Sequence, residues 1–591
     1  MKNRSVLPSR RSLGQFRLSA IATALLLAGI GVAPPAALAD VVSNPTPLPG
    51  CSDNTAFYSP GNGEDIIVPA GFKVSVFAKD LNFPVGIAFK GDQHNFKVYV
   101  LESGHGLPSR CNDELASTSG GLFSPANPFT PDVLVFDQHG GDRKHAMQVL
   151  AKPTAEGVGL AAHGPSIGIG FEKGFQGGRL FVTDSNQAIR TPGGQNNSSR
   201  IVIVDAHGAV TPFIAGLPTG DHPAEQLEFK DGWIYWSQGS TTNSGVVGRD
   251  NGGGANQQDI PCQTIKLSNN VFDSGGGVTT SGYSPFGTHR PGATVPAFNS
   301  ATGKGICDGA ILRAQLHASN PKSTIEPVSW GYRNPYGLRF SPNNHALQGG
   351  LLVSENGEDE RGARPVNNSP DRLTLAQQNP DGSPDYHGWP DRFGFLDSTQ
   401  ALYNPVGGPG DDNPAASVGK PVRPVLAFPP QPITAPLALE PADVAVVGLD
   451  FVPNSFAVGP VKKGAALISR EGDFGFSKGN GTPEAGHDVE LVNFSKPGVP
   501  LQLQQTRFAF NNTGDQAFTD SGVRGINRPT DLKFGPDGCA YLVDYGAVRD
   551  FGQSDPATVY KGAANAPLVQ IPGTGVIWKI CPAQQANDDD D

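Results

Sequence analysis

The sequence predicts an all-β protein, a six-bladed β-propeller with long inserted loops, and three observations lead to this prediction. The 591 residues include 76 Gly and 53 Pro, more than one residue in five, so long helices are improbable. A hydrophobic fraction of 37% and 32 Phe, 11 Tyr and 5 Trp can nevertheless fill a large core. One pair of strands recurs six times along the chain, which is typical of a repeated sheet.

The recurring unit is an apolar strand that ends in Phe, followed by a loop and a second strand that ends in a polar residue. The first strands are 84–89, 167–171, 226–229, 336–340, 447–451 and 530–534. The second strands are 98–102, 179–184, 233–237, 351–355, 466–470 and 541–544. Radial closure buries the edges and faces of six such sheets, whereas a pair of β-sandwiches does not explain the same unit six times.

The regions outside the repeat complete the expected domain organisation. Strands 72–77 and 575–580 lack partners within it, and we expect each to pair with the opposite end of the chain and so close the ring. Residues 61–583 then form the propeller. An N-terminal extension, 40–60, and an acidic tail, 584–591, are expected to be solvated.

Residues 1–39 have the features of an export signal. Five basic residues precede the uncharged apolar run 18–33, and Ala37 and Ala39 supply the small residues of a cleavage site. The run is shorter than the ~20 apolar residues of a membrane-spanning helix and ends in Pro34-Pro35, so we expect no membrane span. The sequence therefore predicts a periplasmic or secreted protein, cleaved near Ala39, by either the general or the twin-arginine route.

Charge and cysteine spacing narrow the function further. Without residues 1–39 the chain keeps 39 basic and 55 acidic residues, a net charge of −16, so nucleic acid is not an expected partner. None of the six cysteines lies within four residues of another, which disfavours zinc and haem sites. In an oxidising compartment they are expected to form disulfides, and the sequential pairing 51–111, 262–307 and 539–581 closes the most local loops.

General motifs add little. The chain has neither a GxGxxG nor a Walker loop, which disfavours nicotinamide and nucleotide cofactors. Residues 164–168 match the GxSxG elbow of serine hydrolases, but a strand follows them where that elbow needs a helix.

Three further motifs carry a resemblance to a known family. They are Asp221-His222 five residues before Leu227, Gly331-Tyr-Arg-Asn-Pro-Tyr-Gly-Leu338, and Tyr386-His-Gly-Trp-Pro390. In this order they resemble those of the soluble glucose and sorbosone dehydrogenases, six-bladed propellers that use pyrroloquinoline quinone (PQQ). The resemblance spans roughly residues 65–582. It implies an exported quinoprotein that oxidises an aldose or a sugar-derived aldehyde by hydride transfer to PQQ.

The resemblance also implies roles for individual residues. His222 would be the general base, with Asp221 to orient it, and Arg333 would stabilise the negative charge that hydride transfer places on the quinone. The residues expected to bind the cofactor are His163, Asn334, Asn356, Arg470 and Arg528. Calcium would be held by backbone carbonyls at Gly357 and Glu358. Because no haem motif is present, the electron acceptor would be an external protein or quinone.

Departures from the family pattern bear on the cofactor. The acidic residue that supports the catalytic His in the family is Ser240 here, so Asp221 or Asn243 would have to replace it. One of two expected arginines is Thr530, and the lysine of the fifth repeat has only Arg470 or Glu471 as its counterpart. Two alternatives therefore stay open: a calcium-dependent propeller lactonase, and a non-catalytic propeller that binds glycans or proteins.

Overall fold

A computed structural model describes residues 58–104, 130–153, 159–161, 164–186, 198–248, 258–275, 277–298, 306–359, 362–366, 369–394, 396–397, 422–472, 486–517, 522–550 and 568–583. The expected export signal, most of the N-terminal extension and the acidic tail lie outside these residues. Within them the secondary structure is β-strand, with short 3-10 helices η2 (Arg143–His145), η3 (Gly174–Gln176), η6 (Pro321–Thr324) and η8 (Asn454–Phe456) and no α-helix. No helix in this described part is long and apolar enough to cross a membrane.

Six sheets of four or five strands carry the predicted repeat, and we call them blades one to six. Blade one is β3 (Pro84–Asp92), β4 (Asn95–Ser103), β5 (Pro131–Asp137) and β7 (Gln148–Ala151). Blade two is β8 (Ser166–Phe171), β9 (Leu180–Asn186), β10 (Ser198–Val204) and β11 (Val210–Leu217). Blade three is β12 (Ala224–Lys230), β13 (Trp233–Gln238), β18 (Ala310–Gln315), β19 (Glu326–Trp330) and β23 (Asp385–Tyr386).

The remaining blades follow the same order from the first strand outward. Blade four is β20 (Asn334–Phe340), β21 (Leu351–Asn356), β22 (Pro370–Ala376) and β27 (Ala438–Ala442). Blade five is β28 (Val446–Phe451), β29 (Ala466–Arg470), β30 (Asp488–Phe494), β31 (Leu503–Asn511) and β1 (Ile66–Ile67). Blade six is β32 (Pro529–Phe534), β33 (Ala540–Asp544), β36 (Gly575–Pro582), β2 (Phe72–Leu81) and β6 (Gly141–Asp142).

Small sheets occupy the insertions. They are β14 (Ile265–Leu267) with β17 (Thr294–Val295) and β26 (Leu426–Phe428), β15 (Phe272–Gly275) with β16 (Val278–Thr280), β24 (Arg392–Phe393) with β25 (Leu396–Asp397), and β34 (Val548–Asp550) with β35 (Leu568–Gln570). The first of them joins segments more than 120 residues apart, because β14 pairs with β26.

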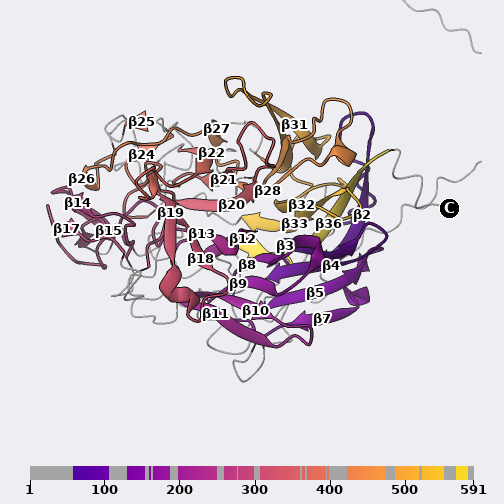
Figure 1. The fold of residues 1–591 in the computed structure, drawn as a ribbon, viewed down its shortest axis with the longest axis horizontal. Coiled ribbons are helices and arrows are strands. Elements are labelled where there is room, and N and C mark those ends of the chain that lie inside the picture. The colour runs from indigo at the N-terminus through magenta and orange to yellow at the C-terminus, as the bar shows by residue number, and fades with distance from the viewer. Residues whose placement is uncertain are drawn as a thin grey trace, which may run out of the picture. The chain divides into compact units, whose positions relative to one another are not determined.

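The first strands of the six blades are neighbours in sequence order, and they surround the centre of the ribbon in Figure 1. Strand β3 contacts β8, β8 contacts β12, β12 contacts β20, β20 contacts β28, and β28 contacts β32. Strand β32 contacts β3 in turn, and the Thr530 hydroxyl of β32 donates to the Pro84 carbonyl of β3 at 3.2 Å. The predicted all-β propeller architecture is therefore confirmed.

Glycines in the first strands permit this close approach. A Cβ at Gly168 would lie 2.2 Å from the Glu225 carbonyl oxygen of the next blade, and one at Gly337 would lie 2.2 Å from that of Val447. No side chain fits such a gap. Between neighbouring blades lie separate apolar clusters, such as that of Tyr235 with Leu338 between blades three and four. The core is thus a set of wedges between sheets.

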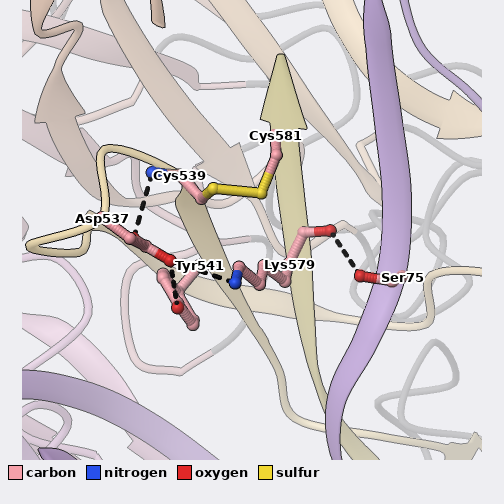
Figure 2. Close-up of a disulfide and its surroundings, with 6 residues drawn as sticks. All are labelled: Ser75, Asp537, Cys539, Tyr541, Lys579 and Cys581. Atoms are coloured by element: carbon pink, nitrogen blue, oxygen red, sulfur yellow. Dashed lines mark hydrogen bonds and ion pairs between the residues drawn. A yellow bond between two sulfur atoms is a disulfide. The ribbon is translucent and has the colours of Figure 1, made fainter. Parts of the chain in front are cut away.

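The two end strands that lacked partners in the repeat pair with each other in blade six, as predicted. Strand β2 pairs antiparallel with β36, and Figure 1 shows the indigo strand beside the yellow one. The disulfide Cys539–Cys581 ties β36 to the start of β33 (Figure 2). Beside it Asp537 accepts a hydrogen bond from the Tyr541 hydroxyl at 2.8 Å and pairs with Lys579 at 3.1 Å.

Two of the three predicted disulfides are confirmed, Cys262–Cys307 and Cys539–Cys581. The third predicted pair, 51–111, lies outside the described residues. One expectation needs correction: the N-terminal extension is not solvated throughout. Tyr58 is buried, and its hydroxyl donates to the Gly525 carbonyl at 2.7 Å, because its ring belongs to the apolar cluster that Phe508 of blade five and Leu532 of blade six share.

Candidate functional site

Asp221 and His222 lie in the loop that leads into β12 of blade three. Their backbone amides donate to the carbonyls of Thr241 and Ser240, which follow β13, so the pair extends a hairpin beyond the strand ends. A Cβ at Gly239 would lie 2.2 Å from the His222 Cβ, so glycine at this position leaves room for the imidazole. The His222 side chain is 18% exposed and that of Asp221 only 4%.

Arg333 lies between β19 and β20, at the start of blade four, and reaches the same carboxylate. Its NH2 lies 3.3 Å from Asp221 Oδ2, and His222 Nδ1 also lies 3.3 Å from that oxygen. The guanidinium is 5% exposed, and its Nε has no hydrogen-bond partner within the described structure. A base, a carboxylate and a buried cation from two blades therefore form one cluster.

Two further acceptors hold the Arg333 guanidinium. NH1 donates to the Gly357 carbonyl at 2.7 Å, and NH2 forms an ion pair with Asp359. Both acceptors belong to the loop after β21. The backbone amide of Arg333 donates to Glu355 Oε1 at 3.0 Å, which fixes the main chain as well. Charge-assisted hydrogen bonds of this kind leave a planar guanidinium little freedom.

The loop after β21 is itself fixed from two sides. The Asn243 side chain accepts from the Asp359 amide at 2.9 Å and donates to the Asp359 carbonyl at 2.8 Å. The Gly357 amide donates to Asp371 Oδ1 at 2.7 Å. Asn243 was one of two candidates to replace the missing acidic support of His222. The structure gives the position beside His222 to Asp221 and uses Asn243 to hold Asp359.

The two asparagines predicted to bind the cofactor are adjacent. Asn334 Nδ2 donates to Asn356 Oδ1 at 2.7 Å, and Asn356 Nδ2 donates to the Val446 carbonyl at 2.7 Å. They are buried at facing ends of β20 and β21, and Asn334 directly follows Arg333 in the sequence. Their amides thus link blade four to blade five beside the cluster.

The two remaining predicted arginines differ in their surroundings. Arg470, at the end of β29, binds Asp488 at 2.7 Å and also pairs with Glu440 and Glu490. Arg528 is buried just before β32 and donates to the Gly472 carbonyl at 3.1 Å. His163, the last predicted cofactor ligand, lies outside the described residues.

Two further carboxyls lie near the cluster: the buried Glu225, which no motif predicted, and Glu471, one of the two candidates for the counterpart of the family's lysine. Burial raises the pKa of Glu225, in β12, well above its usual range, while Arg333 lowers it and Glu471 raises it. Burial likewise raises the pKa of Glu471, while Arg528 and His487 lower it. Charged side chains from blades three to six thus shift the pKa values of one another's carboxyls. The sequence does contain a signal for Glu225. It lies four residues before the Phe that ends its first strand, and the residue at this position is uncharged in the other five first strands.

Calcium was expected at the carbonyls of Gly357 and Glu358. In this arrangement the Gly357 carbonyl accepts from Arg333, whose positive charge would repel a cation at the same oxygen. The Glu358 side chain is buried and accepts from the Ser369 hydroxyl. Among the described residues no three His, Cys, Asp or Glu side chains are grouped to hold a metal. These residues do not fit a calcium ion as they are arranged here.

Comparisons with known proteins add the following. No protein-family model and no curated protein matches the chain. Among solved structures it is similar to the PQQ domain of pyranose dehydrogenase from Coprinopsis cinerea, at 14% identity and a TM-score of 0.46 over 87% of this chain and 97% of that one. It is also similar to the calcium structure of a carbohydrate-active enzyme of family AA12 from Trichoderma reesei, at 15% identity and a TM-score of 0.47 over 88% of this chain and 97% of that one. It is similar to the soluble aldose sugar dehydrogenase of Escherichia coli at 13% identity and a TM-score of 0.41, over 86% of this chain and 99% of that one.

Proposed function

We propose that the protein is an exported sugar oxidoreductase that oxidises an aldose or a sugar-derived aldehyde, with PQQ as the hydride acceptor and an external protein or quinone as the final electron acceptor. The observation that carries the proposal is the shared carboxylate, because His222 Nδ1 and Arg333 NH2 both lie 3.3 Å from Asp221 Oδ2. Base, orienting group and cation are the parts that sugar oxidation by hydride transfer needs.

His222 supplies the base in this proposal. With the proton of the neutral ring on Nδ1, beside Asp221, the lone pair of Nε2 can take the proton of a sugar hydroxyl. The nearby carboxylate stabilises the imidazolium that results. Since the imidazole is 18% exposed while Asp221 is 4% exposed, the ring is the part of the pair that a substrate from solvent can reach.

Arg333, Arg528, Asn334 and Asn356 would hold the cofactor. The unpartnered Nε of Arg333 is the observation that favours an additional acceptor at this site, since buried donors are normally satisfied. When bound, PQQ supplies a two-electron acceptor for the hydride of the sugar. Arg333 then presents a fixed positive charge where negative charge develops, without having to reorganise during the reaction.

The test replaces His222 by Ala and measures sugar oxidation by bleaching of a redox dye, after the protein has been mixed with PQQ. We expect turnover to fall at least ~100-fold, the usual contribution of a general base, with the cofactor absorbance unchanged. His207→Ala, which removes an exposed histidine from the turn before β11, is the matched control and should retain full turnover. Full turnover in the His222 variant would contradict the proposal.

A further inference from the structure

The acceptors around Arg333 differ in how easily a ligand could replace them. The Gly357 carbonyl is main chain, and its own amide is fixed to Asp371. Asp221 is 4% exposed and is held in the hairpin by its backbone. The Asp359 side chain is 24% exposed. An anion that arrives from solvent can therefore replace Asp359 far more readily than either of the other two.

The backbone of Asp359 is held independently of its side chain. Asn243, which is buried, makes two hydrogen bonds to the peptide groups on either side of the Asp359 Cα, and the Val366 amide donates to the Asp359 carbonyl at 3.1 Å. Rotation of the Asp359 side chain away from Arg333 NH2 therefore needs no movement of the Asp359 backbone.

We propose that Asp359 competes with anionic ligands for Arg333 NH2 and thereby sets the affinity of this site for anions. In the absence of a ligand, Asp359 compensates the charge of a buried guanidinium, which is costly to leave unpaired. A carboxylate of the ligand takes its place on binding. The inference rests on the proposed function only for the identity of that ligand.

The experiment measures anion binding to the full-length protein by isothermal titration calorimetry, after metal has been removed with a chelator. The two probes are PQQ, which carries three carboxylates, and oxalate, a small dianion. Asp359→Asn should bind both about five- to tenfold more tightly than the wild type, since a competing charge pair is worth ~1 kcal/mol. Asp381→Asn removes the same charge from an exposed turn and should bind both as the wild type does.

Asp359→Ala is a second variant in case the asparagine keeps a hydrogen bond to Arg333, and it should show the same gain. Thermal unfolding verifies that each variant is folded. Unchanged or weaker binding by both folded variants overturns the inference, and so does the absence of binding of both anions by every protein. Tighter binding by the variants, together with a wild type that oxidises no sugar, would refute the proposed function and leave this inference standing.

Discussion

Arg333 and Arg470 are both buried arginines that the family resemblance assigns to the cofactor site, yet their surroundings differ. Arg333 shares one carboxylate with a partly exposed imidazole and keeps an unpartnered nitrogen. Arg470 binds Asp488 through two nitrogens and has two more carboxyls beside it. Burial and charge alone therefore do not distinguish the two arginines. What distinguishes Arg333 is the partly exposed imidazole of His222 beside its carboxylate partner.

The largest effect on stability is expected from a substitution that removes Arg470 from among its carboxylate partners. Arg470→Met leaves three acidic side chains without their common cation, and we expect the free energy of unfolding to fall by about 3–5 kcal/mol. Urea unfolding measures this loss. A change below ~1 kcal/mol would show that the cluster is dispensable for stability and would remove the contrast with Arg333.

A smaller effect concerns pH. Burial and the neighbouring Glu490 raise the pKa of Glu440 to about 8, although Arg470 lowers it. Because this folded-state pKa lies above the unfolded value, the stability that Glu440 contributes is complete at acidic pH and is lost as pH rises through about 8. Glu440→Gln should therefore weaken the decline of the melting temperature between roughly pH 5 and pH 9. This range begins near the pKa of Glu440 in the unfolded chain and ends above its pKa in the folded protein.

Melting curves of wild type and variant across this range provide the measurement. Equal slopes for the two proteins would mean that Glu440 does not hold a proton in the folded state. A variant that becomes less stable than the wild type at high pH would contradict the sign of the effect.

The sequence alone predicted the repeated part of the fold well. The first strands were found because an apolar run ending in Phe is a local pattern, and the pairing of β2 with β36 followed from two strands left over at the ends. Two disulfides followed from spacing. The small sheets of the insertions were not predicted, because β14 and β26 are short and far apart in sequence.

The candidate site was predicted in part. Asp221, His222 and Arg333 were identified from their motifs, and the structure brings them together. The contact of Arg333 with Asp359 was not predicted, because it joins two loops whose spacing follows no period. For the same reason the position of Arg470 among three carboxyls could not be predicted from the sequence.

The central claim is that His222 and Arg333 work through one shared carboxylate, and the catalytic efficiency of Asp221→Asn tests it most directly. The asparagine keeps the shape but loses the charge that balances the guanidinium and that, in the proposed function, orients the imidazole. We predict that kcat/KM for sugar oxidation falls by a factor of at least ~100, while Asp381→Asn stays at the wild-type value. An Asp221→Asn protein as active as the wild type would contradict the account.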